Sequence, residues 1–284
     1  MLQALTSAVS GLDAFQQEID VIGNDIANVD TVAYKSATTD LADSFSQTLA
    51  NSDLGGGASI QIGLGVVTAG IYNEFTQGAI NPTGVQTDMA ISGSGFFVVQ
   101  DPLSGTQYAT RAGDFQLNSN GYLVTPGGME VIGYTTPAKT TIGPIQINDA
   151  NMPAADASAG ATMSSWSVDP SGNIDITLSD GTSYVTGQIL LQNFSNPNGL
   201  VKEGNNLYGN IGIAGPLGGS TSPTPAAPGT NGLGTIQSGA LEESNVDLSS
   251  EFANLIETQR AFQANARIIT TSDEMLQDLV DMKH

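Results

Sequence analysis

The chain is poor in the residues that many enzymes use for chemistry: its 284 residues include no cysteine, one histidine and only seven lysines and arginines. Without cysteine it forms no disulfide and offers no thiolate for zinc binding or nucleophilic attack. Its histidine is His284, the last residue of the sequence, a position where no hydrolytic triad is held in place. Thiol chemistry and histidine-dependent hydrolysis are therefore excluded.

Basic residues are outnumbered by 28 aspartates and glutamates, which gives a formal net charge of −21 at neutral pH. Such a surface repels nucleic-acid phosphates and anionic lipid headgroups. We therefore expect no nucleic-acid partner and no direct membrane insertion.

Long apolar runs are also missing, and none reaches the roughly 20 residues of a membrane span. The N-terminal region lacks the basic start and compact apolar core of a secretory signal, because Asp13, Glu18 and Asp20 interrupt it. We expect any export to use a route that does not read a cleaved signal peptide.

What the sequence does contain is helical periodicity at its two ends. Near the N-terminus, apolar residues recur by threes and fours, which predicts one stripe of a helix with a heptad-like seam and a local stammer between Leu12 and Phe15. The stripe comprises Leu2, Leu5, Val9, Leu12, Phe15, Ile19, Ile22, Ile26 and Val29.

The C-terminal residues 241–284 contain neither glycine nor proline and predict a second amphipathic helix. Asp247 is its candidate N-cap, and Gln259 is the one polar position expected in its seam. The apolar stripe comprises Leu248, Phe252, Leu255, Phe262, Ala266, Ile269, Leu276 and Leu279.

Between the ends the pattern changes to period two, as in the strictly alternating residues 174–178, with turn dipeptides such as Asn120-Gly121 and Asp180-Gly181. We predict an α+β protein. Its terminal helices, in residues 1–34 and 246–284, pair as a coiled coil, and a central all-β, hairpin-rich domain occupies residues 71–234. Residues 35–70 and 235–245 are expected to be extended linkers, and residues 215–234 a low-complexity loop.

The two apolar stripes need partners. They can pack on each other, on further copies of the chain, or on the chain's own β domain, and periodicity alone leaves these alternatives open.

Candidate chemistry in the central domain has simpler interpretations. Trp166 is a sugar-stacking candidate but fits a strand core, and Arg111 is expected to pair with a carboxylate such as Asp114 or with an adjacent subunit. Residues 169–175 superficially resemble a calcium loop but lack its full ligand series, so we predict a β-turn. We expect no catalytic, cofactor or metal residues and no enzyme activity. A secreted glycan-binding or hydrolytic β domain remains a remote alternative, because the spacing of the acidic side chains is not visible in a sequence.

Several long motifs resemble the flagellar rod and hook protein family. The N-terminal segment GLDAFQQEIDVIGNDIANVDTVAYK is similar to that family's N-terminal signature, and QRAFQANA to its C-terminal one. The matching segments are residues 11–35, 61–66, 88–97, 108–121, 205–208, 239–248 and 259–266.

The resemblance implies a structural subunit of the bacterial flagellum, exported unfolded by the flagellar type III apparatus without a cleaved signal peptide, that assembles into a helical tube. Terminal helices of neighbouring copies would line the tube and the β domain would form its wall. The implied partners are further copies of the chain, the distal rod protein, the hook cap, the hook–filament junction proteins and the export apparatus.

Within the family, the residues favour a short hook protein, a flexible joint that transmits torque from motor and rod to filament. Gly23, Ile26 and the segments 46–48 and 244–248 are similar to the hook type. The distal rod protein, a drive shaft of similar length, is the alternative.

The sequence departs from the family pattern at Asp25, where asparagine is usual, and at Ala33, where glycine is typical. We expect the turn after the first helix to be gentler or to depend on Asp30, because alanine avoids positive φ. The residues expected to carry self-assembly are Leu5, Leu12, Ile19, Ile22, Ile26, Leu248, Phe252, Leu255, Phe262 and Ile269.

Overall fold

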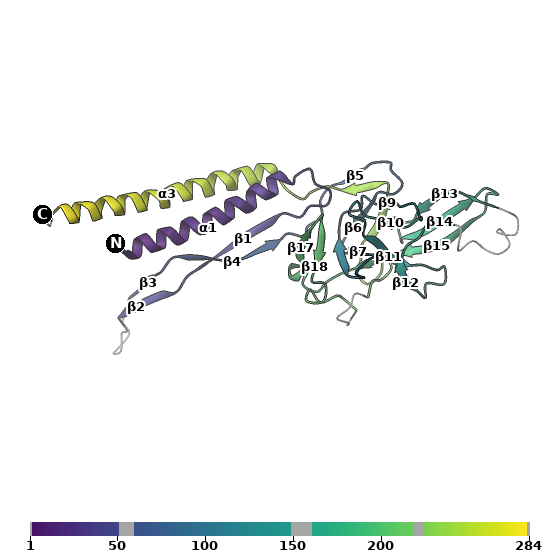
Figure 1. The fold of residues 1–284 in the computed structure, drawn as a ribbon, viewed down its shortest axis with the longest axis horizontal. Helices are drawn as coiled ribbons and strands as arrows, with labels where there is room; N and C mark the ends of the chain where they lie inside the picture. Colours follow the sequence, from purple (N-terminus) through teal and green to yellow (C-terminus); the bar gives the residue numbers. More distant parts are fainter. Residues whose placement is uncertain (1, 51–59, 149–160, 219–223, 283–284) are drawn as a thin grey trace. The chain divides into compact units, whose positions relative to one another are not determined.

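The computed structural model describes residues 2–50, 60–148, 161–218 and 224–282. The chain forms two compact units: unit 1 contains residues 1–29, 35–74 and 246–284, and unit 2 contains residues 30–34 and 75–245. Two terminal helices and a β-rich central part are present, as the sequence predicts (Figure 1). Among the described helices, none is long and apolar enough to cross a membrane.

Unit 1 is built on helices α1 (Leu2–Ala27) and α3 (Leu248–Asp281), which lie side by side (Figure 1). Asp247 is the N-cap of α3, as predicted, and its side chain accepts a hydrogen bond from the Ser249 amide at 2.9 Å. Glu251 lies in the first turn, where a negative charge suits the helix dipole.

The expected linker at residues 35–70 is instead largely β structure in its described part. Strand β1 (Ala37–Asp43) pairs antiparallel with β4 (Val66–Asn73), and β2 (Ser46–Ala50) pairs with β3 (Ile60–Gly63). Alternate residues of β1 and β4 are half-buried, which is the pattern of a ribbon covered on one face.

Helix α1 binds this ribbon through two side chains. Ser10 Oγ accepts from the Val66 amide at 3.2 Å, and Asp25 Oδ2 accepts from the Ala37 amide at 2.9 Å. The linker prediction fails because short, half-polar strands give a weak period-two signal.

Unit 2 is organised around one antiparallel sheet, with twelve strands in the described residues, whose main path runs β13-β14-β15-β11-β7-β8-β18-β17. All pairings that the structure records here are antiparallel. The strands on this path are β13 (Met163–Val168), β14 (Asn173–Leu178), β15 (Ser183–Ile189), β11 (Glu130–Tyr134), β7 (Phe96–Gln100), β8 (Gln107–Thr110), β18 (Leu207–Gly209) and β17 (Val201–Gly204). Attached to it are β9 (Gln116–Leu117), β10 (Leu123–Val124), β12 (Ile142–Pro144) and β16 (Leu191–Gln192).

The core of unit 2 is apolar and aromatic. Its main cluster includes Phe97, Phe115 and the fully buried Ile174 and Ile176, and Phe97 and Phe115 meet edge to face with ring centroids 5.1 Å apart. Trp166 belongs to this cluster, which agrees with its interpretation as a core residue.

The second expected linker, residues 235–245, is also mostly strand. Strand β19 (Thr235–Ser238) pairs with β6 (Met89–Ser92), and β20 (Ala240–Glu242) pairs with β5 (Ile80–Pro82). Strands of three or four residues with mixed polarity are hard to distinguish from loops by pattern. The predicted loop at residues 215–234 has no named strand or helix in its described part, and residues 219–223 lie outside the described residues.

The turn after α1 is not gentle. Ala33 is fully buried and has φ of 53°, the left-handed conformation in which glycine is typical. For an alanine this conformation costs about 1–2 kcal/mol. The hydrogen bond from the Ala33 amide to the Glu242 carbonyl oxygen, at 2.8 Å, helps to hold the turn.

Candidate assembly surface

The contact between the two helices of unit 1 includes small and polar residues. Gly11 of α1 is buried, and a side-chain carbon added there would collide with the amide of Asn265 on α3. Glu18 accepts a hydrogen bond from the side chain of Thr258. Phe15, Glu18, Leu41 and α3 residues between 254 and 261 line a hollow of about 290 Å³. The helices therefore approach closely where side chains are small.

A series of less exposed positions spaced alternately by threes and fours runs along each helix, which is the spacing of a heptad seam, and on α1 the buried Ala14 lies next to this series. We call these two series the contact line. On α1 and just after it, the contact line consists of Ala8, Gly11, Phe15, Glu18, Ile22, Asp25 and Val29. On α3 it consists of Leu255, Thr258, Phe262, Asn265, Ile269, Ser272 and Leu276.

The contact line differs from the predicted stripe. Val9 of the stripe is 41% exposed, whereas the buried Ala8 and Ala14 of α1 are not part of the stripe. Gln259 is exposed, so the expected polar seam position is wrong. The most buried polar positions of α3 are instead Thr258 and Ser272, at 4% and 3% exposure. Hydrophobic periodicity missed these two positions because they carry no apolar signal, although the three–four spacing through Leu255, Phe262 and Ile269 of the same helix passes through both of them.

The ten residues predicted for self-assembly fall into three groups. Ile22, Leu255, Phe262 and Ile269 lie on the contact line itself. Leu5, Leu12, Ile19 and Ile26 are half-buried and repeat every seven residues beside it. Leu248 and Phe252 are exposed, at 37% and 49%.

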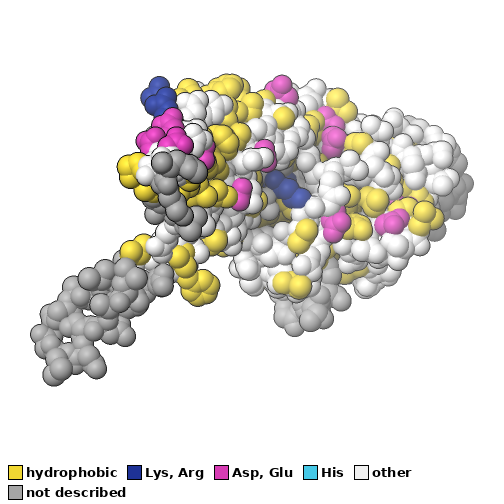
Figure 2. Space-filling model, turned by 60° about the vertical axis from the view of Figure 1, so that its left-hand side comes forward, with side chains coloured by type: hydrophobic (Ala, Val, Ile, Leu, Met, Phe, Trp, Pro, Cys, Tyr) yellow, Lys and Arg dark blue, Asp and Glu magenta, His cyan; other side chains and the backbone are white. Residues whose placement is uncertain are grey.

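Helix α3 carries large apolar side chains that unit 1 does not cover. Single exposed apolar residues are ordinary, but several on one helix form a surface that favours a partner. Figure 2 shows hydrophobic and acidic side chains intermingled on one face, with lysine and arginine in few places. The exposed apolar residues of α3 are Leu248, Phe252, Ile256, Ile268, Met275, Leu279 and Val280, and the exposed Met282 follows as its C-cap.

Carboxylates gather beside the contact line. Burial raises the pKa of Glu18, the Thr258 hydrogen bond opposes the rise, and the charge of Glu257 adds to it. Burial also raises the pKa of Glu251, and the nearby Asp25 carboxylate adds to that rise. Because both pKa values are raised, protonation favours the folded helix contact.

The candidate chemistry of the central domain has structural partners. Arg111 pairs with a carboxylate, as expected, but its partner is Glu242, with Nη1 and Oε2 3.3 Å apart, rather than Asp114. Asp169 accepts hydrogen bonds from the amide and side chain of Asn173, both at 2.8 Å, so this segment is the predicted turn. Within the described residues, no group of three or more acidic or histidine side chains is arranged to hold a metal ion.

Comparison with known proteins adds independent information. Three family descriptions match the chain: "Flagella basal body rod protein" at residues 5–35, "Flagellar hook protein FlgE/F/G D1 domain" at residues 90–176, and "Flagellar basal body rod FlgEFG protein C-terminal" at residues 237–282.

Among curated relatives, the flagellar basal-body rod protein FlgG of Bacillus subtilis is 39% identical over all of both chains. The FlgG of Borreliella burgdorferi is 32% identical over 97% of each chain. The flagellar hook protein FlgE of Escherichia coli is 26% identical, over 99% of this chain and 100% of its own, in an alignment of 420 residues. A crystal structure of Helicobacter pylori flagellar hook protein FlgE2 matches with a TM-score of 0.22 at 14% identity, over 66% of this chain and 47% of that one, a likeness too weak to carry an argument.

Proposed function

This chain belongs to the flagellar rod and hook protein family, whose members are structural subunits that assemble into homopolymers within the flagellum, and we propose that it is a subunit of the distal rod. The observation that carries the proposal is the 39% identity to a basal-body rod protein over the whole of both chains. That alignment spans 288 residues for a chain of 284, so it needs few gaps.

The hook function favoured by the sequence motifs has weaker support. Identity to the hook protein of Escherichia coli is 26%, and the alignment extends to 420 residues because that protein carries sequence with no counterpart here. We therefore place the drive-shaft function ahead of the flexible joint.

We further propose that α1 and α3 pair as a coiled coil inside the assembled tube. The contact line repeats every seven residues on each helix, which supports this geometry. Its small members bring the two backbones close, and the exposed apolar residues of α3 are left for the helices of neighbouring copies.

The partners we propose are further copies of the chain, the subunits that precede and follow them along the flagellar axis, and the export apparatus.

Purified basal bodies provide the test. We expect an epitope-tagged chain to be located in the straight distal rod, and a deletion strain to lack both distal rod and hook, because the hook is built on the rod. Electron cryomicroscopy of the polymer should show a straight tube. A curved tube outside the cell, labelled along its length by the tag, would instead identify the hook and refute the proposal.

A further inference from the structure

Three segments of unit 2 lie next to unit 1 in the sequence: residues 30–34, 75–82 and 240–245, here called the connectors. The chain passes between the units after residues 29, 34, 74 and 245. Every covalent path between the units therefore enters unit 2 through a connector.

The connectors are hydrogen-bonded to one another. The Ala33 amide donates to the Glu242 carbonyl oxygen and the Glu243 amide to the Ala79 carbonyl oxygen, both at 2.8 Å. The β20–β5 pairing continues the second contact, with Glu242 opposite Ile80. At Gly78 there is no room for a side chain, because a carbon added there would collide with the Glu243 carbonyl oxygen.

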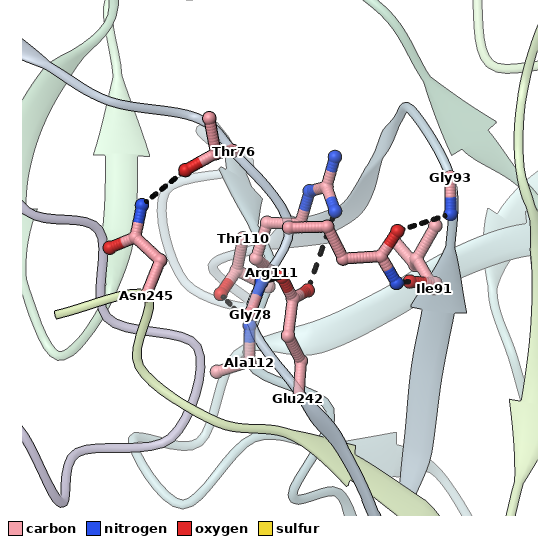
Figure 3. A network of polar contacts seen from close by, with 10 residues as sticks. Thr76, Gly78, Ile91, Gly93, Thr110, Arg111, Ala112, Glu242 and Asn245 are labelled. Atoms are coloured by element: carbon pink, nitrogen blue, oxygen red, sulfur yellow. Dashed lines mark hydrogen bonds and ion pairs between the residues drawn. The ribbon is translucent and has the colours of Figure 1, made fainter. Parts of the chain in front are cut away.

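Glu242 contacts all of these elements. Its carbonyl oxygen accepts from the first connector at Ala33, and its Oε1 accepts from the Gly78 amide at 2.9 Å. Its Oε2 lies 3.3 Å from Arg111 Nη1, which anchors it to the loop after β8 (Figure 3). The side chain of Asn245 adds a hydrogen bond to Thr76 Oγ1 at 2.9 Å.

This ion pair is buried, with Arg111 4% and Glu242 1% exposed. The Arg111 guanidinium lies over the Phe96 ring, 5.2 Å from its centroid, and its Nε has no hydrogen-bond partner among the described residues. Burial also raises the pKa of the adjacent Tyr208 phenol, which indicates a dry site.

If two apolar side chains replaced this ion pair, the folded protein would be similarly or more stable, because removing charges from water is costly. Apolar residues, however, do not form directional hydrogen bonds. A carboxylate with one oxygen on Gly78 and the other on Arg111 fixes the position of β20 against both neighbours.

We propose that Glu242, Arg111 and Gly78 form a clamp that positions the three connectors, so that mechanical load passes between the units without the connectors separating. The load-bearing part of this inference rests on the proposed function as a rod subunit. The clamp itself is a property of the subunit.

Amide hydrogen exchange of the purified full-length chain tests the clamp. In Glu242→Gln and in Gly78→Ala, we expect the amides of Ala33, Gly78 and Glu243 to exchange at least about tenfold faster. Amides of β13, β14 and β15 should change less than about twofold. Uniform acceleration over unit 2 would reduce the pair to a general contribution to stability and overturn the proposal.

A double variant separates positioning from stability. Arg111→Met with Glu242→Met removes both charges, and we expect a melting temperature within a few degrees of wild type but the same local acceleration at the connectors. The matched control is Ile176→Val in the core of β14, which should accelerate exchange in β13–β15 and leave the connectors unchanged. Wild-type exchange at the connectors of the double variant would refute the clamp.

Swimming speed in media of increasing viscosity tests whether the clamp carries mechanical load. We expect cells with the double variant to assemble flagella but to lose speed at least twofold more than the Ile176→Val strain in the most viscous medium. Equal speeds at every viscosity would refute the load-bearing role. If instead the chain is absent from purified basal bodies, the rod proposal fails, while hydrogen exchange still decides whether the clamp exists.

Discussion

Two glycines in α1 allow the helix contact to be tested by the same small change in two environments. Gly11 is buried against Asn265, whereas a side-chain carbon added at Gly23 would have no atom within 4 Å. Both glycines lie in the interior of the helix. Alanine in place of glycine there stabilises a helix by about 1 kcal/mol, because glycine loses more backbone entropy on folding.

At Gly23 nothing opposes this gain, so we expect Gly23→Ala to stabilise the folded helix by about 1 kcal/mol. At Gly11 the added methyl group occupies the place of the Asn265 amide. Overpacking costs about 1–3 kcal/mol, and it is nearer the lower value when the obstacle is the end of a flexible side chain. The net effect of Gly11→Ala is therefore between neutral and about 2 kcal/mol destabilising.

The critical concentration for polymerisation of the purified full-length chain, measured by sedimentation, reports both changes. About 1 kcal/mol corresponds to about fivefold in concentration. We expect a fivefold decrease for Gly23→Ala, and for Gly11→Ala a value between unchanged and about 30-fold higher. In the Asn265→Ala background, Gly11→Ala should be more favourable by at least about 1 kcal/mol than in the wild-type background, because the Asn265 amide no longer collides with the added methyl group.

Equal effects of the two alanines, or the absence of coupling between positions 11 and 265, would refute the contact line. An increased critical concentration for Gly23→Ala would show that another copy covers this face of α1.

Two further predictions concern the same helices. Leu255→Asp and Phe262→Asp each place a charge on the contact line at a cost of several kcal/mol, so immunoblots of culture supernatants should show normal export while electron microscopy shows no polymer. Gln259→Asp is the exposed control, and motility of the first two variants at the wild-type level would remove these positions from the interface. Lower pH should promote assembly, because Glu18 and Glu251 have pKa values raised by burial in the folded state, so the folded state binds more protons. The resulting cost in folding free energy is present above the folded pKa values and disappears as pH falls toward the ordinary value of 4.5. Light scattering should therefore rise from pH 7 to 4.5, and added salt should also raise it at pH 7. Scattering that stays flat or falls as the pH is lowered would contradict this.

The sequence predicts both helices because apolar residues and the Asp247 cap act locally. It does not reveal the β1–β4 ribbon, because the strands are half-polar and their pairing partners are separated by the intervening residues 44–65. It identifies Ala33 as unusual but not its left-handed turn, which depends on the distant carbonyl oxygen of Glu242.

In the candidate assembly surface, too, some residues could be predicted from the sequence and others could not. Ile22, Phe262 and Ile269 are apolar, so their spacing reveals them. Gly11 and Thr258 also lie on the contact line, but they act through small size and hydrogen bonding, which hydrophobic periodicity does not measure. The Arg111–Glu242 pair joins residues 131 positions apart, and no local pattern in either segment indicates it.

We propose that the contact line and the charge together restrain assembly of the free subunit. Small and polar residues occupy half of the contact line, which limits the apolar area of the intramolecular helix contact, and large apolar residues such as Phe252 and Ile256 stay exposed. A free subunit with that surface is prone to associate. Residues 1–35 and 241–284 oppose this with fourteen acidic and four basic residues, a net charge of −10 in 79 residues. Repulsion between like-charged ends weakens encounters between free subunits, and it is overcome only where many apolar contacts form at once, as at the end of a growing tube. Neutralising several exposed acids on α3, such as Asp273, Glu274 and Asp278, should therefore lower the critical concentration and produce polymer in the cytoplasm before export. Soluble monomer at the wild-type concentration in such a variant would show that charge does not restrain assembly.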